Sequence, residues 1–229
     1  MLRRLRTEER GTTLMELVIA TAAGGVIFMG LTMVVMASMH QTTRTQNRVH
    51  ATQEARLVMQ RIVTELHSSC VAADVSPIQE SSNGTSLGYV YGTGSGAAIT
   101  PVMHKVFLSG NTLYLSTYPS TTGSTPKWTF SGTATSTVPL ISNVAPVTSG
   151  GPIFTYYTYS SGAISSSPLT VPLSGTNAAK AVQVNIALKV EPRTSTVSNP
   201  GNPAVIQNSA FLRYSPPSAN VNAANLPCE

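Results

Sequence analysis

A single carboxylate, Glu16, stands near the start of an apolar run that extends from Thr12 to Met39. On insertion scales an ionised carboxylate at the centre of a membrane helix costs roughly 2.5–3.5 kcal/mol, so such a residue is a functional hypothesis by default. An amine from a neighbouring molecule would neutralise the carboxylate. A buried ion pair of this kind specifies register better than it adds stability. We therefore expect Glu16 to set how this segment meets another one.

A second pattern, Gly84-Thr85-Ser86-Leu87-Gly88, matches the G-x-S-x-G sequence of the hydrolase nucleophile elbow. That motif needs a strand before the serine and a helix after it. Here a loop rich in Ser and Asn precedes Ser86, and a β-prone segment follows it. Asp74 and His104 are available as partners only by elimination. We therefore expect Ser86 to be a loop residue, and we expect neither a catalytic residue nor a cofactor.

The two cysteines, Cys70 and Cys228, lie near opposite ends of the chain that follows the apolar run. In an oxidising exterior a disulfide between them is plausible, and closing so long a loop stabilises by up to roughly 5 kcal/mol in the chain-entropy model. Two unpaired thiols are the alternative. His67 precedes Cys70 by three residues, but a structural zinc site needs four ligands. We expect no metal site.

The apolar run has the length of a membrane span. Its 28 residues would form a helix of about 42 Å, which exceeds a hydrocarbon core of about 30 Å. Four arginines precede it and should keep the N-terminus in the cytoplasm. These are Arg3, Arg4, Arg6 and Arg10. Two alternatives remain: an uncleaved anchor, and an ordinary secretory signal, which has a shorter apolar core and would be cleaved at the small residues Ala37-Ser38.

Residues 41–70 continue this helix as an amphipathic second half. The apolar positions from Ala55 to Leu66 follow the i, i+3, i+4 spacing of a helix face. Gln60, Arg61, Thr64 and Glu65 supply the polar face. One helix from about Thr13 to Ser69 is predicted, with its second half packed on a sheet.

Residues 71–229 alternate between β-prone segments and turns rich in Gly, Ser, Asn and Pro. The predicted strands are Leu87–Tyr91, His104–Leu108, Thr112–Thr117, Lys127–Phe130, Val138–Ile141, Ile153–Tyr159, Ala181–Val190 and Ala204–Tyr214. Ser109-Gly110-Asn111 indicates a hairpin between the second and third of them. The order predicts an α+β fold, a long helix followed by an antiparallel sheet.

The N-terminal sequence resembles the signature of type IV prepilins and pseudopilins: a basic leader that ends in Gly, then a T-L-x-E-L run, then a long apolar helix. Gly11, Thr12 and Glu16 occupy the leader end, the first mature position and the acidic position. The resemblance implies that a prepilin peptidase cleaves after Gly11 and that the new amine of Thr12 is methylated. Residues 1–11 would be the leader peptide, residues 12–40 the transmembrane and assembly helix, and 71–229 the extracytoplasmic domain.

The order of elements further along the chain resembles the PilW-like minor pilins and J-type pseudopilins. This resemblance implies a pilin-like fold and a structural role in a type IV pilus-like fibre, as an initiating or tip-proximal subunit. The implied partners are the prepilin peptidase, other pilin subunits, the inner-membrane assembly platform and membrane lipid. The implied location is the cytoplasmic membrane, crossed once, and then a pilus or pseudopilus at the cell surface.

The composition bears on partners of other classes. Residues 12–229 carry 10 basic and 7 acidic groups, a net charge of +3 that is spread along the chain. No basic cluster with interleaved aromatic residues indicates nucleic-acid binding. A membrane-anchored surface protein with a β-rich binding or hydrolytic domain is the alternative function.

Overall fold

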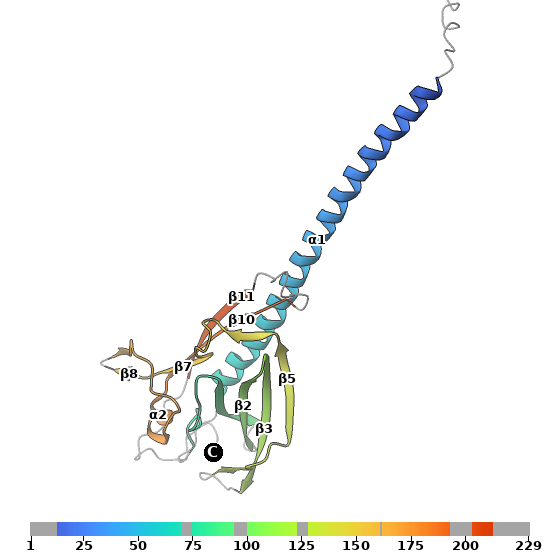
Figure 1. Cartoon of the computed structure of the whole chain (residues 1–229). Helices are drawn as coiled ribbons and strands as arrows, with labels where there is room; N and C mark the ends of the chain where they lie inside the picture. The colour runs from blue at the N-terminus through green and yellow to red at the C-terminus, as the bar shows by residue number, and fades with distance from the viewer. Residues whose placement is uncertain are drawn as a thin grey trace, which may run out of the picture. The chain divides into compact units, whose positions relative to one another are not determined.

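The computed structural model describes residues 13–69, 75–93, 100–122, 128–160, 162–192 and 203–212. The chain separates into two compact units, Met1–Gln46 and Asn47–Glu229. The second unit contains antiparallel sheets together with the end of a long helix, so the fold is α+β, as predicted (Figure 1). Its first residue lies within the predicted amphipathic segment rather than at residue 71.

The long helix, α1, extends from Leu14 to His67 and confirms the predicted helix to within two residues at each end. Leu31–His67 contains neither Gly nor Pro, the two residues that most weaken a helix. In the second unit one face of α1 is buried, at Ala51, Ala55, Met59, Ile62 and Leu66. Their spacing of three or four residues is that of one helix face, which confirms the predicted apolar stripe.

The first sheet has five strands in which β3 is central. It contains β1 (Ser86–Thr93), β2 (Thr100–Ser109), β3 (Thr112–Thr122), β4 (Thr129–Phe130) and β5 (Ser136–Ser142). Strand β3 pairs with β2 on one edge and with β5 and β4 on the other. The predicted hairpin is confirmed: Ser109 pairs with Thr112 across a two-residue turn, where Gly110 has a φ of 59°, which glycine adopts without strain.

The second sheet is built around β10. It contains β6 (Val144–Pro146), β7 (Phe154–Tyr157), β10 (Gln183–Val190) and β11 (Ala204–Phe211). Side chains of β10 alternate between half-buried and buried, with Val184, Ile186, Leu188 and Val190 inside, as the sequence alternation predicted. A small hairpin of β8 (Tyr159–Ser160) and β9 (Ala163–Ile164) stands apart from this sheet.

One hydrophobic core joins the second half of α1 to both sheets. Ile62 and Leu66 of the helix belong to the same cluster as Leu113 and Leu115 of β3 and Ile186 of β10. Burial of this many apolar side chains is the main stabilising contribution to the fold. The C-terminal end of α1 therefore lies inside the second unit.

Several local features differ from the sequence prediction, and the short strands β6 and β9 were not among the predicted strands. The predicted strand Ile153–Tyr159 is interrupted at Thr158, because β10 begins at Gln183 opposite Tyr157 and offers Thr158 no ladder partner. A short helix, α2 (Gly175–Lys180), was not predicted. Ser174 caps it, and the Ser174 side chain accepts a hydrogen bond from the Asn177 amide at 3.3 Å.

Candidate functional site

Glu16 lies in the first turn of α1 and closes a capping box with Thr13. The Thr13 amide donates to Glu16 Oε2 at 3.0 Å, and the Glu16 amide donates to Thr13 Oγ1 at 3.3 Å. The Thr13 hydroxyl lies 3.2 Å from the same carboxylate oxygen. This reciprocal arrangement satisfies two amides that have no partner within the helix. The carboxylate therefore has a local structural role in the isolated chain.

The helix surface that follows Glu16 is apolar on all sides. No large hydrophobic side chain between Leu14 and Met39 is buried; Ile27, for example, is 66% exposed. By length and composition α1 can cross a membrane, with an 18-residue window of mean hydropathy 2.2 that is 0% buried. An uninterrupted apolar surface of this size needs lipid or protein around it.

Polar side chains in this half of α1 bond to the helix itself. The hydroxyls of Thr21 and Thr32 donate to the carbonyls of Leu17 and Phe28, each four residues earlier, at 3.0 and 2.8 Å. In a hydrocarbon environment every polar group needs an internal partner. These two threonines meet that requirement, which leaves Glu16 as the ionisable group of the apolar half.

A second carboxylate, Glu65, links the other end of α1 to the first sheet. Tyr89 of β1 donates its hydroxyl to Glu65 Oε2 at 2.6 Å, and His104 Nδ1 of β2 lies 2.8 Å from the same oxygen. Arg61 Nε donates to Glu65 Oε1 at 2.9 Å. Tyr89 and His104 are direct partners in the β1–β2 ladder, so adjacent strands present both donors to one carboxylate.

These contacts favour the ionised form of Glu65, whose side chain is 13% exposed. Burial raises the pKa of Glu65, but the hydrogen bonds from His104, Tyr89 and Arg61 outweigh it and lower the pKa to about 2. Tyr91 stacks on the His104 ring with centroids 5.6 Å apart and limits its movement. Burial, with the adjacent Glu65 charge, raises the pKa of Tyr89. Tyr89 and His104 therefore hold α1 on the sheet through one anion, and Arg61 supports that anion from the helix itself.

Of the predicted site residues, only Glu16 lies among the described residues. Gly11, Thr12, Cys70 and Cys228 fall outside them, so the predicted cleavage site and disulfide stay predictions.

The hydrolase-like pattern does not form an elbow. Ser86 is the first residue of β1 rather than a loop residue, and a turn rather than a strand precedes it. Its register partner is Phe107, whereas His104 pairs with Tyr89 and its Nδ1 contacts Glu65. Asp74 lies outside the described residues.

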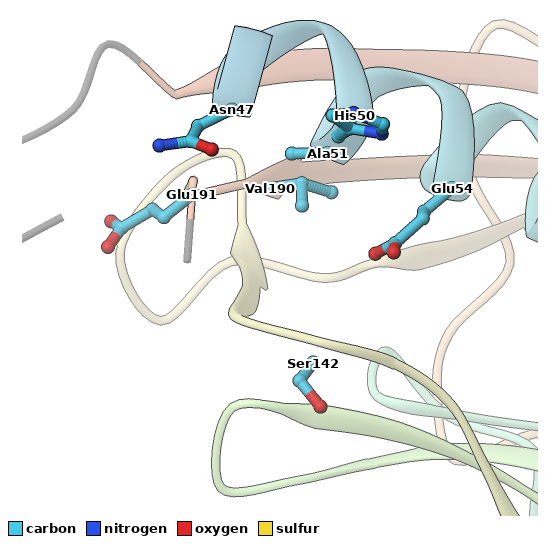
Figure 2. A pocket seen from close by; sticks show the side chains of 7 residues that line it. All are labelled: Asn47, His50, Ala51, Glu54, Ser142, Val190 and Glu191. Carbon is cyan, nitrogen blue, oxygen red and sulfur yellow. The ribbon is translucent and has the colours of Figure 1, made fainter. Parts of the chain in front are cut away.

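A hollow of about 230 Å³ lies where α1 enters the second unit (Figure 2). Ala51 and Val190 form an apolar floor, and Glu54 and Glu191 come from opposite sides of Val190 without converging on one point (Figure 2). No three metal-ligating side chains among the described residues gather into a metal site, here or elsewhere.

Sequence reasoning missed two of these features. The Thr13-x-x-Glu16 spacing is itself a capping-box signal and could have been found. Glu65 was assigned to the polar face of the helix, but its contacts with the sheet were not predicted, because Tyr89 and His104 lie 24 and 39 residues away in the sequence and no local pattern marks them.

Comparison with models of known protein families and with curated proteins gave no match for this chain.

Proposed function

We propose that this chain is a prepilin-like structural subunit, cleaved after Gly11 and assembled through α1 into a type IV pilus-like fibre. One observation carries the proposal: a helix whose first half is apolar on every side and unburied, with one carboxylate at its start. Such a helix suits two environments in turn, first lipid and then a bundle of like helices. Because both are apolar, transfer between them exposes no apolar surface to water.

In this proposal Glu16 receives the methylated amine of Thr12 from an adjacent subunit. The capping box supplies a rival explanation, in which Glu16 serves only the start of its own helix. A substitution that removes the charge of residue 16 but keeps its hydrogen bonds distinguishes the two explanations. A glutamine at position 16 retains the capping box, since Gln also accepts from the N-cap amide, but it cannot form an ion pair with an amine.

The test compares Glu16→Gln and Glu16→Ala with Thr13→Ser, a matched control that keeps the capping hydroxyl and the charge. Each full-length variant is expressed in the native cell. Processing is followed by mass, and incorporation by the ratio of subunit in sheared fibres to subunit in the membrane. We expect all three to be cleaved, both Glu16 variants to incorporate about tenfold less than the parent, and Thr13→Ser to match it. Parental incorporation of Glu16→Gln would reduce Glu16 to a helix cap.

The mass and N-terminal sequence of the mature protein from its native membrane test the processing itself. We expect an N-methylated Thr12 at the start. An intact Met1 would instead indicate an uncleaved anchor that carries a β-rich surface domain, and a start near Ser38 would indicate a secretory signal. Either result would remove the fibre proposal.

A further inference from the structure

A groove of about 360 Å³ lies between α1 and β11, and every residue that lines it belongs to the second unit. Met59, Val63 and Ile206 supply apolar side chains to it. The lining residues of α1 fall between positions 52 and 64, a length of about 18 Å at 1.5 Å per residue. A strand of about five or six residues has the same length, so the groove can hold a short extended segment.

The backbone edge of β11 borders this groove. Residues 205–208, four in succession, line it. Successive side chains of a strand point to opposite faces of a sheet, so one face alone would contribute only every second residue. The groove therefore lies along the edge of β11, which is the outermost strand of its sheet among the described residues.

The outer edge of β11 has backbone groups that no described strand uses. Strand β11 pairs with β10 and with no other strand in the described part of the chain. In an antiparallel strand the N–H and C=O of one residue point to the same side, and this side alternates along the strand. The Leu212 amide donates to the Val182 carbonyl, on the side of β10. Val205, Gln207 and Ser209 therefore direct their backbone groups away from β10.

Two more hydrogen bonds define which donors remain on this edge. The register partner of Gln207 is Ala187, whose amide donates to the Ile153 carbonyl at 2.9 Å, away from β11. The Ser209 amide donates to the side chain of the preceding residue at 2.8 Å. The amides of Val205 and Gln207 remain. An extended segment beside β11 can accept from both, which is the mode of recognition called strand addition.

The charge of the groove indicates the chemistry of such a segment. Arg56 is the one charged side chain among the described residues that line the groove, and it is exposed. Its neighbours one helical turn away, Thr52 and Gln60, are neutral, so α1 supplies no carboxylate to pair with it. A second copy related by two-fold symmetry would bring its own Arg56 to the same interface, with like charges together. The groove therefore favours an acidic segment from a different protein.

We propose that the groove between α1 and β11 binds an extended, acidic segment of another protein chain. The segment pairs with the outer edge of β11 as an added strand. Its alternate apolar side chains pack on Met59 and Val63, and one of its carboxylates pairs with Arg56. This interaction is independent of the proposed role of α1 in a fibre, and it requires neither cleavage nor assembly.

The probes are two hexapeptides that alternate apolar and polar residues, Ser-Val-Thr-Val-Thr-Glu and Glu-Thr-Val-Thr-Val-Ser, each with blocked ends and a fluorescent label. The full chain is solubilised in a polyoxyethylene detergent, which carries no charge, and fluorescence anisotropy measures binding. We expect at least one peptide to bind saturably with a Kd of about 0.1 mM. Hydrogen exchange at the Val205 and Gln207 amides should be fast without the peptide and slower in its presence.

N-methylated peptides test the backbone pairing. Two isomers of the bound peptide carry methyl groups on alternate amide nitrogens, so their side chains are identical. Only one set of amides faces β11 in an added strand. We expect that isomer to bind about tenfold more weakly and the other isomer to bind like the unmodified peptide.

Two variants test the charge. Arg56→Gln should raise the Kd about fivefold, the effect of one exposed ion pair. Arg48→Gln removes an exposed cation of the same helix that does not line the groove, and its Kd should equal that of the parent. A peptide with Gln in place of Glu should bind the parent and Arg56→Gln equally, which isolates the pair. Circular dichroism spectra that match the parent establish that both variants fold.

Four results would overturn the proposal. One is the absence of saturable binding of either peptide up to about 5 mM. Equal Kd values for the two methylated isomers would rule out strand addition, and an unchanged Kd in Arg56→Gln would rule out the acidic partner. The last is slow exchange at the Val205 and Gln207 amides without peptide, which would mean that the edge is already covered. Sedimentation would then assign the groove to residues 213–229 in a monomer, or to a second copy in a dimer.

Discussion

The two halves of α1 share one continuous backbone and differ in what surrounds them. From Leu14 to Met39 the side chains are apolar and exposed, whereas from Ala51 to Leu66 one face is buried against two sheets. Each half has one notable carboxylate. Within the described part of the chain, Glu16 bonds to its own helix turn, whereas Glu65 bonds to donors on two strands. The comparison teaches that only the second half is packed by the chain's own sheets. The apolar side chains of the first half must therefore be covered by lipid or by other molecules.

The largest expected effect comes from removing an isoleucine from each half. Ile62 is 1% exposed, so Ile62→Ala should lower the free energy of unfolding of the second unit by about 2–5 kcal/mol. Ile27→Ala is the matched control and should change it by less than about 0.5 kcal/mol. Urea unfolding of the detergent-solubilised chain, followed by Trp128 fluorescence, measures both. Equal losses would mean that the first half also stabilises the second unit.

The next effect is the loss of stability in acid, which should depend on Glu65 and not on Glu16. The pKa of Glu65 falls from 4.5 to about 2 on folding, so its contribution is complete above about pH 4.5 and disappears as the pH falls to 2. That shift corresponds to about 3 kcal/mol. The charged and titratable groups around Glu65 are Arg61, Tyr89 and His104.

Unfolding free energies measured between pH 6 and pH 2 check this prediction. Glu65→Gln should be less stable than the parent at pH 6 and should lose less stability on acidification. Glu16→Gln should follow the parent curve, because the hydrogen bonds that Glu16 makes with described residues go to Thr13 and not to the second unit. A parental acid profile for Glu65→Gln would show that other carboxylates control the transition.

The smallest effect compares two buried tyrosines of the second unit. Tyr89 donates its hydroxyl to an anion, whereas Tyr156 donates to the carbonyls of Asn83 and Ser86 at 3.1 Å each. Tyr89→Phe should cost about 1.5–3 kcal/mol and Tyr156→Phe about 0.5–1.5 kcal/mol, since hydrogen bonds to charged groups are stronger. Urea unfolding at pH 7 measures both losses. The reverse order would argue that Glu65 is fully satisfied by Arg61 and His104 alone.

Much of the fold could be predicted because it depends on local periodicity. Apolar spacing predicts which side chains are buried, since a helix face repeats every three or four residues and a strand face every two. This holds for the stripe from Ala55 to Leu66 and for the alternation from Val184 to Val190. The turn at Gly110 is likewise indicated by its own residues, Ser109-Gly110-Asn111. These elements correspond to the structure almost residue by residue.

The remainder depended on contacts between distant segments. The break at Thr158 follows from where β10 begins, and the burial of Glu65 follows from Tyr89 and His104. Helix α2 has only six residues, too few for a periodic pattern to stand out. No window along the chain contains enough of these partners to reveal them.

The continuity of α1 has a mechanical consequence. Between Asn47 and His67, within the second unit, no glycine or proline interrupts the helix, so this stretch has no built-in hinge. A pull along its axis therefore loads the buried contacts from Ala51 to Leu66 together, in shear, and not one after another. The Glu65 cluster lies at the far end of that load path and ties the helix to two strands. Tension applied through this part of α1 would therefore be shared by its buried side chains and by the hydrogen bonds of Glu65.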